Sequence, residues 1–275
     1  MTLCRSDGEL FRWPAAHNGL WLKASGSKEA GYQLEFAAGL TVLVGANGRE
    51  ITVTKSDSLD EGVFEELLLN QVNPLVATLS GQLTLHGSAI ELGESTISFL
   101  APSGYGKSTL AAAFTIAGHR FLTDDTLGVD FVESSAWARV GAPFIRLNDD
   151  SADLLQASRV RDMQMGQDDD RKQRFVDSSS RFHCKVVRPM KAIYFLRNDG
   201  ALNVTITREQ GFRVIGELVR NSFLLDVDEP ESMRRHFQQL TNLAEIVPTF
   251  GLDYPRAYER LPDVVAEVVT HARSL

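Results

Sequence analysis

Short runs of alternating apolar and polar residues fill the first sixty positions of the chain. Three of them have the alternation that is typical of a strand, at residues 20–23, 32–36 and 40–44. Asn47-Gly48 follows the third run, and this pair tolerates the positive φ angles of a tight hairpin turn leading into residues 51–53. The pattern predicts a small β-rich lobe over residues 1–57.

A different spacing begins at Asp60. Apolar residues recur every three or four positions as far as Leu79, as one face of a helix requires, and Pro74 predicts a kink or an interruption in that helix. After Gly81 the period becomes strand-like, over residues 83–92 and 95–100 with a turn at Gly93-Glu94. A helix over 107–117, ended by Gly118, and a strand over 119–123 follow.

The rest of the chain combines a predicted hairpin with helices. Residues 185–196 and 202–207 flank a turn signal at Asn198-Asp199-Gly200, and from Phe212 onward amphipathic helices dominate, notably 231–244 and 261–272. Helices that follow a mixed sheet predict an α/β or α+β domain over residues 58–275 and exclude a β-sandwich.

The amino-acid composition argues against several classes of protein. The 275 residues carry a net charge of −8, which argues against a general nucleic-acid coat. Cys4 and Cys184 are too few for a disulfide framework or a multi-cysteine metal site, so we expect unpaired thiols. No apolar run approaches about 18 residues, so we expect neither a membrane helix nor a signal peptide, and a cytoplasmic protein.

The segment with the clearest chemistry is Ala-Pro-Ser-Gly-Tyr-Gly-Lys-Ser-Thr at 101–109, between an apolar strand and a helix. In this context the motif predicts a phosphate-binding loop, because successive backbone N–H groups at a helix N-terminus attract polyphosphate. Lys107 is expected to reach the β and γ phosphates and the Ser108 hydroxyl to ligate Mg²⁺. The predicted nucleotide-binding residues are Ser103, Gly104, Tyr105, Gly106, Lys107, Ser108 and Thr109.

One position departs from this motif. Ala101 stands where glycine is usual, which is tolerable only if its φ angle is negative. The alternative is a chance Gly-Lys-Ser at the start of a helix, but seven of the eight motif positions agree.

Asp124-Asp125 follows the strand after the loop helix. A right-handed strand-helix-strand crossover places the carboxyl ends of both strands at one edge of the sheet, which brings these carboxylates beside the phosphates. One can then hold Mg²⁺ while the other accepts a proton from an attacking hydroxyl. The alternative is a pair of aspartates that only forms a turn.

His86 lies on the strand before the loop. If residues 83–92 and 95–100 form a hairpin about Gly93-Glu94, the residue numbers of two residues opposite each other sum to about 187. This register places His86 opposite Ala101, at the mouth of the loop. There it can donate to a phosphate oxygen or influence an aspartate. The alternative is a packed strand histidine without a functional role.

Three segments together resemble the kinase domain of the HPr kinase/phosphorylase family. They are Leu-His-Gly-Ser at 85–88, the loop at 102–108, and Gly-His-Arg-Phe-Leu-Thr-Asp-Asp at 118–125. The resemblance implies a serine kinase related in fold to phosphoenolpyruvate carboxykinase, using ATP and Mg²⁺. It implies Asp124 as catalytic base, Ser108 and Asp125 at the metal, and Lys107 and His86 as further catalytic residues.

A second, weaker likeness involves Val-Val-Arg-Pro-Met-Lys at 186–191, which is similar to a basic loop of that family and makes Arg188 and Lys191 candidate phosphate or substrate residues. Thr109 and the Met190-Lys191 pair depart from the bifunctional enzymes, so phosphorylase activity is not expected. The layout is more similar to short kinases encoded with lasso-peptide biosynthesis genes.

These features predict a peptide or protein acceptor that carries a serine, presented in a disordered terminus that pairs with a strand edge of the N-terminal lobe. Nucleic acid and membrane are not expected partners, and a homo-oligomer is compatible with the sequence. The alternatives are a P-loop ATPase or GTPase and a non-catalytic nucleotide-binding module, and the choice between ATP and GTP stays open. Asp168-Asp169-Asp170 is expected to be a solvated loop.

Overall fold

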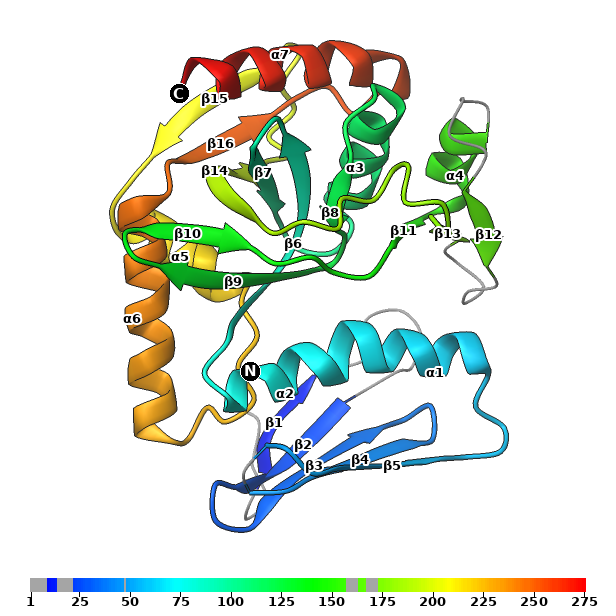
Figure 1. The fold of residues 1–275 in the computed structure, drawn as a ribbon, viewed down its shortest axis with the longest axis vertical. Helices are drawn as coiled ribbons and strands as arrows, with labels where there is room; N and C mark the ends of the chain where they lie inside the picture. The colour runs from blue at the N-terminus through cyan, green and yellow to red at the C-terminus, as the bar shows by residue number, and fades with distance from the viewer. Residues whose placement is uncertain (1–8, 14–21, 47, 157–162, 167–172) are drawn as a thin grey trace. The chain divides into compact units, whose positions relative to one another are not determined.

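The computed structural model describes residues 9–13, 22–46, 48–156, 163–166 and 173–275, which form a mixed α/β structure (Figure 1). The chain divides into two compact units. The first contains Met1–Leu83 and Phe223–Gln239, and the second contains Thr84–Ser222 and Leu240–Leu275. This division differs from the predicted boundary at residue 57, and the core of the first unit explains why.

The first unit is an antiparallel five-stranded sheet with a helical segment. The strands follow chain order, β1 (Glu9–Trp13), β2 (Leu22–Ser27), β3 (Gly31–Phe36), β4 (Leu40–Val44) and β5 (Ile51–Lys55). β1 was not predicted. The β4–β5 hairpin is confirmed, but its loop is longer than two residues, because Gly45 N–H donates to Glu50 O at 2.8 Å. Asn47 lies outside the described residues.

The helical segment consists of α1 (Glu61–Leu67), a π-helical turn (Leu68–Val72) and α2 (Asn73–Leu79). Asp60 caps α1, since its carboxylate accepts from Gly62 N–H at 2.8 Å. The predicted interruption at Pro74 is confirmed, because the α-helical hydrogen-bond pattern changes just before the residue that has no N–H to donate.

The helical segment and the sheet share one hydrophobic core. Leu67, Val72 and Leu75 are buried in the same cluster as Leu34 and Leu40. The sheet therefore covers its apolar face with these helices, which is why residues 60–79 belong with the strands rather than with the phosphate loop.

The second unit is built on an eight-stranded mixed sheet. Its strands are β6 (Leu83–Leu92), β7 (Ser95–Leu100), β8 (Phe121–Thr123), β9 (Thr126–Val132), β10 (Ser135–Ala138), β14 (Arg188–Leu196), β15 (Thr205–Glu209) and β16 (Thr249–Asp253). The order is β10-β9-β6-β7-β14-β16-β15, with β8 on β6 and a further β10–β14 pairing. The predicted register of the β6–β7 hairpin is confirmed, because Gly87 pairs with Leu100 and Ser88 with Phe99.

The second predicted hairpin is wrong. β14 and β15 are not neighbours, because β16 lies between them, parallel to β14 and antiparallel to β15. All five residues of β16 are buried, and this strand from near the end of the chain lies between the two strands that were expected to pair. The turn signal at 198–200 therefore joins two strands that do not pair.

Helices α3 (Lys107–Ile116) and α7 (Leu261–Ser274) pack against each other (Figure 1). Leu110, Phe114 and Val268 belong to one buried cluster with Ile97 and Phe99 of β7. The predicted end of α3 at Gly118 is confirmed, since that glycine has a φ angle of 95°. Further helical segments are α5 (Phe212–Arg220), α6 (Pro230–Ile246), of which Pro230–Gln239 belong to the first unit, and a short 3-10 turn (Tyr258–Arg260).

A small substructure beside α3 was not predicted. It contains α4 (Asp149–Gln156) and a three-stranded sheet, in the order β11 (Phe144–Leu147), β13 (Gln173–Val176) and β12 (Gln164–Gly166). The acidic run at 168–170 lies outside the described residues, as does Cys4, whereas Cys184 is a buried free thiol. Within the described ranges, no helix is both long and apolar enough to span a bilayer.

Candidate active site

The segment after β7 has the backbone of a phosphate-binding loop. Gly104 and Gly106 both have φ angles of 86°, in the region where a side chain is strained, and Gly106 caps the start of α3. Ala101 keeps a negative φ, since the described non-glycine residues with positive φ are Asp125, Glu133 and Ser180. Alanine is therefore tolerated at position 101, as expected for a residue with a negative φ angle.

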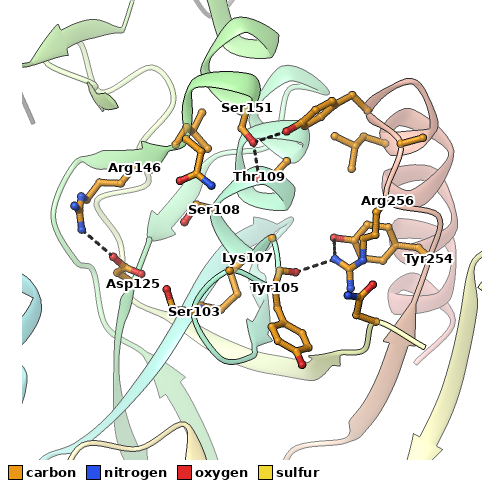
Figure 2. A pocket seen from close by; sticks show the side chains of 18 residues that line it. Ser103, Tyr105, Lys107, Ser108, Thr109, Asp125, Arg146, Ser151, Tyr254 and Arg256 are labelled. Atoms are coloured by element: carbon orange, nitrogen blue, oxygen red, sulfur yellow. Dashed lines mark hydrogen bonds and ion pairs between the residues drawn. The ribbon is translucent and has the colours of Figure 1, made fainter. Parts of the chain in front are cut away.

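A cleft of about 430 Å³ opens above this loop (Figure 2). All seven residues predicted to bind nucleotide line it, and so does Asp125. The remaining lining residues come from three other segments: Arg146, Leu147, Asn148 and Ser151; Asn198; and Tyr254, Arg256, Ala257, Tyr258 and Leu261.

Lys107 is buried at the first turn of α3. Its ammonium group donates to the carbonyl oxygens of Ala101 at 2.8 Å and Pro102 at 3.3 Å, and lies 2.9 Å from His86 Nε2. Because an ammonium group can only donate, His86 Nε2 is the acceptor and the imidazole proton lies on Nδ1. That Nδ1–H donates to the backbone oxygen of Asp125 at 3.0 Å. His86 thus links the loop lysine to the aspartate pair.

The aspartates lie at the loop because of the strand directions. β8 is antiparallel to β6, and β6 is antiparallel to β7, so β7 and β8 run the same way. Their carboxyl ends meet at one edge of the sheet, as the crossover predicts, although β6 lies between them.

Asp124 is buried, with 5% of its surface exposed, and its carboxylate is held by three donors. The Ser88 hydroxyl donates to Oδ1 at 2.6 Å, Arg146 N–H donates to Oδ2 at 3.3 Å, and Ser108 supplies a further side-chain hydrogen bond. Burial raises the pKa of Asp124, the charge of Asp125 raises it further, and the three hydrogen bonds oppose this shift.

Asp125 has a different environment. It has a φ angle of 70°, which Asp tolerates better than most residues, and its side chain lines the cleft. The Arg146 guanidinium lies 3.6 Å from one carboxylate oxygen and His86 Nδ1 lies 3.8 Å from the other. Figure 2 shows Asp125 and Arg146 facing each other on one side of the loop.

Sequence reasoning missed Arg146. Its side chain is only 7% exposed, and it lies on β11 between the buried residues Ile145 and Leu147. A buried arginine inside an apolar strand needs a charged partner, and Asp125 is that partner. An arginine within an apolar run, downstream of two adjacent acids, was the available signal.

The segment between β16 and α7 forms another wall of the cleft. Arg256 Nη1 donates to the Tyr105 carbonyl oxygen and to the Tyr254 hydroxyl, both at 2.8 Å, and Arg256 Nη2 donates to the Arg197 carbonyl oxygen. The guanidinium lies 4.1 Å from the centre of the Tyr254 ring. These bonds hold this wall against the loop. The sequence contains no motif that identifies this segment as part of the site, and the pattern from Phe212 onward predicted mainly helices.

Arg188 and Lys191 are not brought to the cleft. β14 is parallel to β7, with Met190 opposite Thr96, so both residues lie near the amino ends of these strands, whereas the loop follows the carboxyl end. Arg188 instead binds Glu91, with Nη2 2.9 Å from Oε1, and Arg120 binds the same carboxylate. The predicted contact of these residues with phosphate is therefore replaced by a structural role for Arg188.

Comparisons with known proteins point to a distant structural neighbour. No family model matches the chain, and no curated protein matches it. A solved structure of the Hpr(Ser) kinase/phosphatase from Coxiella burnetii is similar at 12% sequence identity, over 70% of this chain and 96% of that one, with a TM-score of 0.38.

Proposed function

We propose that this protein is a kinase that transfers the γ-phosphate of ATP, with Mg²⁺, to a hydroxyl group of a peptide or protein. The observation that carries the proposal is one cleft that combines a loop with left-handed Gly104 and Gly106, the buried Lys107, and a carboxylate paired with a buried guanidinium. These groups suit phosphoryl transfer, because its catalysis consists of positioning the reactants and stabilising negative charge.

The oxygen ligands present fit Mg²⁺. This ion is usually held by one or two carboxylates together with phosphates and water, and the Ser108 hydroxyl and the Asp124 carboxylate are hydrogen-bonded to each other beside the loop. The described residues contain no cluster of three or more acidic, histidine or cysteine ligands, which such a site does not need. The ion would neutralise phosphate charge when nucleotide is bound.

The surroundings of the two aspartates favour a division of roles opposite to the one expected from the sequence. Asp124 is buried, and Ser88, Ser108 and the Arg146 amide hold its carboxylate in a fixed orientation. Because a carboxylate has about four lone-pair sites, this fixed group can still supply one ligand to a metal ion. Asp125 lines the cleft, where an acceptor hydroxyl can reach it. We therefore assign Asp125 as the base and Asp124 to the metal.

Lys107 and His86 complete the proposed machinery. Without nucleotide, Lys107 is held by the carbonyl oxygens of Ala101 and Pro102, and these bonds must be exchanged for phosphate oxygens when nucleotide binds. His86 contacts the lysine on one ring nitrogen and the Asp125 backbone on the other, so we assign it a positioning role.

The acceptor that we propose is a serine near the end of a flexible peptide, such as a lasso-peptide precursor, because the motifs at 85–88, 102–108 and 118–125 resemble serine kinases. We place the reaction in the cytoplasm, where ATP is supplied. Among the described residues, β5 pairs with β4 alone and so offers an open strand edge to a peptide.

The test is a matched pair of lysine substitutions. Lys107→Ala should abolish nucleotide binding or phosphate transfer, whereas Lys185→Ala removes an exposed lysine outside the cleft and should change neither. Isothermal titration with Mg²⁺-ATP, followed by mass spectrometry of serine peptides, provides both measurements. A Lys107→Ala protein as active as the wild type would refute the assignment, and nucleotide hydrolysis without an acceptor would favour an ATPase.

A further inference from the structure

The wall between β16 and α7 faces the phosphate loop from the side opposite Asp125 and Arg146. Figure 2 shows Tyr254 and Arg256 on one side of the loop and the Asp125–Arg146 pair on the other. Tyr258 follows two residues after Arg256 and also lines the cleft. Two tyrosines, an arginine and Leu261 thus come from one short segment.

The direction of phosphoryl transfer decides which reactant each side takes. The attacking and leaving oxygens lie roughly in line across the γ-phosphate, so the acceptor approaches from the side of the base. In the proposed function that side is marked by Asp125. The nucleoside is attached beyond the α-phosphate, at the other end of the triphosphate, and must therefore lie toward the wall formed by residues 254–261.

The side chains of this wall suit a nucleoside. Tyr258 has 39% of its surface exposed, and its hydroxyl lies 3.1 Å from Ser151 Oγ, which lies 2.9 Å from Thr109 Oγ1. Thr109 is one residue beyond the metal-side Ser108, on the first turn of α3. A row of hydroxyls therefore leads from the loop to an aromatic ring, and the only carboxylate among the described lining residues is Asp125, on the opposite side.

We propose that the nucleoside half of the triphosphate binds against this wall, with the base in contact with the ring of Tyr258 and the sugar near Ser151. The inference rests on the proposed function. A flat base with a polar edge needs an aromatic or apolar surface flanked by a few hydrogen-bonding groups, and Tyr258, Leu261 and Ser151 supply these. Arg256 keeps the wall in place through its bonds to Tyr105 and Tyr254.

The experiment compares ATP with inorganic tripolyphosphate, which has the phosphates but no nucleoside. The dissociation constants of both are measured by titration calorimetry with Mg²⁺ for the wild type, Tyr258→Ala, Tyr258→Phe and Phe212→Ala. Phe212 is 97% exposed on α5, is not among the residues lining the cleft, and controls for loss of an aromatic ring.

Wild-type protein should bind ATP more tightly than tripolyphosphate. Tyr258→Ala should weaken ATP binding at least about tenfold and leave tripolyphosphate binding within about twofold, because stacking acts on the base alone. Tyr258→Phe keeps the ring and should bind ATP nearly as the wild type does, and Phe212→Ala should match the wild type for both ligands.

Four results would overturn the inference. Equal weakening of both ligands by Tyr258→Ala would show that the residue acts through the loop, by way of Ser151 and Thr109. No change for either ligand, or equal wild-type affinity for ATP and tripolyphosphate, would remove the nucleoside from this wall and leave the phosphate site standing. A wild-type protein that binds neither ligand would overturn the proposed function together with this inference.

Discussion

The adjacent aspartates provide the sharpest mutational test of the site. In Asp125→Asn the amide still fits beside Arg146, but it cannot accept a proton from the acceptor hydroxyl. General base catalysis typically contributes 10²–10⁴-fold, so we expect a loss of phosphate transfer of about that size with the affinity for Mg²⁺-ATP nearly unchanged. The guanidinium of Arg146 loses a charged partner at 3.6 Å, so the melting temperature should also fall.

Asp124→Asn should behave differently. Its two carboxylate oxygens accept from Ser88, Ser108 and the Arg146 amide, whereas an asparagine has one accepting oxygen. At least one of these donors is left facing an NH₂ group, which costs about 1–3 kcal/mol of stability. Since Ser108 and Asp124 are the proposed metal ligands, Mg²⁺-dependent ATP affinity should fall as well.

The assay measures ATP binding by calorimetry with Mg²⁺ and with a chelator, and transfer to peptide with γ-labelled ATP. The proposed roles predict that the advantage of Mg²⁺ over chelator is retained in Asp125→Asn and reduced in Asp124→Asn. The reverse pattern would refute the division of roles argued from burial and would restore Asp124 as the base.

Three further substitutions test other parts of the structure. Glu91→Gln should lower the melting temperature at neutral pH while leaving ATP affinity unchanged. Burial opposes ionisation of Glu91, but hydrogen bonds from Arg120, Arg188 and Cys184 together lower its pKa, so its stabilising effect exists above the unfolded pKa and disappears as the pH falls through the folded pKa. The difference in melting temperature between Glu91→Gln and wild type should therefore shrink in acid, and a constant difference would contradict this. Gly106→Ala places a Cβ at a φ of 86° and 3.2 Å from Arg256 Nη1, so it should cost about 1–2 kcal/mol and weaken ATP binding, checked by thermal unfolding and calorimetry. Val53→Pro should weaken peptide recognition, seen as a raised Michaelis constant for peptide at unchanged ATP affinity, whereas Val53→Thr should not.

The Val53 substitution follows from the hydrogen-bond pattern of the β4–β5 hairpin. Gly45 N–H donates to Glu50 O, and Ser56 N–H donates to Gly39 O, so the alternation turns the N–H of Val53 away from β4. Proline there removes an outward donor without breaking the hairpin. Deleting residues 1–57 is a poorer test, because it would strip the sheet from Leu67, Val72 and Leu75 and expose their shared core.

The local chemistry of the loop could be predicted from the sequence. The strand at 95–100, the glycines at 104 and 106, and the helix from Lys107 are neighbours along the chain, so short-range signals determine their arrangement. The β6–β7 register was predictable for the same reason, because a tight turn at Gly93-Glu94 fixes the pairing of both strands.

Long-range packing could not be predicted. Nothing near Thr249–Asp253 indicates that this strand lies between β14 and β15, and the apolar residues there fit a helix equally well. For the same reason, the sequence did not reveal Arg146 or the wall formed by residues 254–261, since each reaches the loop only through tertiary packing. The position of Arg188 could not be predicted either, because it depends on the direction of β14 relative to β7.

Phosphate transfer from ATP to a serine can be detected directly from its product. A set of serine-containing peptides with disordered ends is incubated with the protein, Mg²⁺ and γ-labelled ATP, and the peptides are analysed by mass spectrometry. We expect labelled phosphate on a serine with the wild type and Lys185→Ala, and none with Lys107→Ala or without Mg²⁺. Labelled inorganic phosphate released at the same rate with and without peptides, with no labelled peptide, would contradict this expectation.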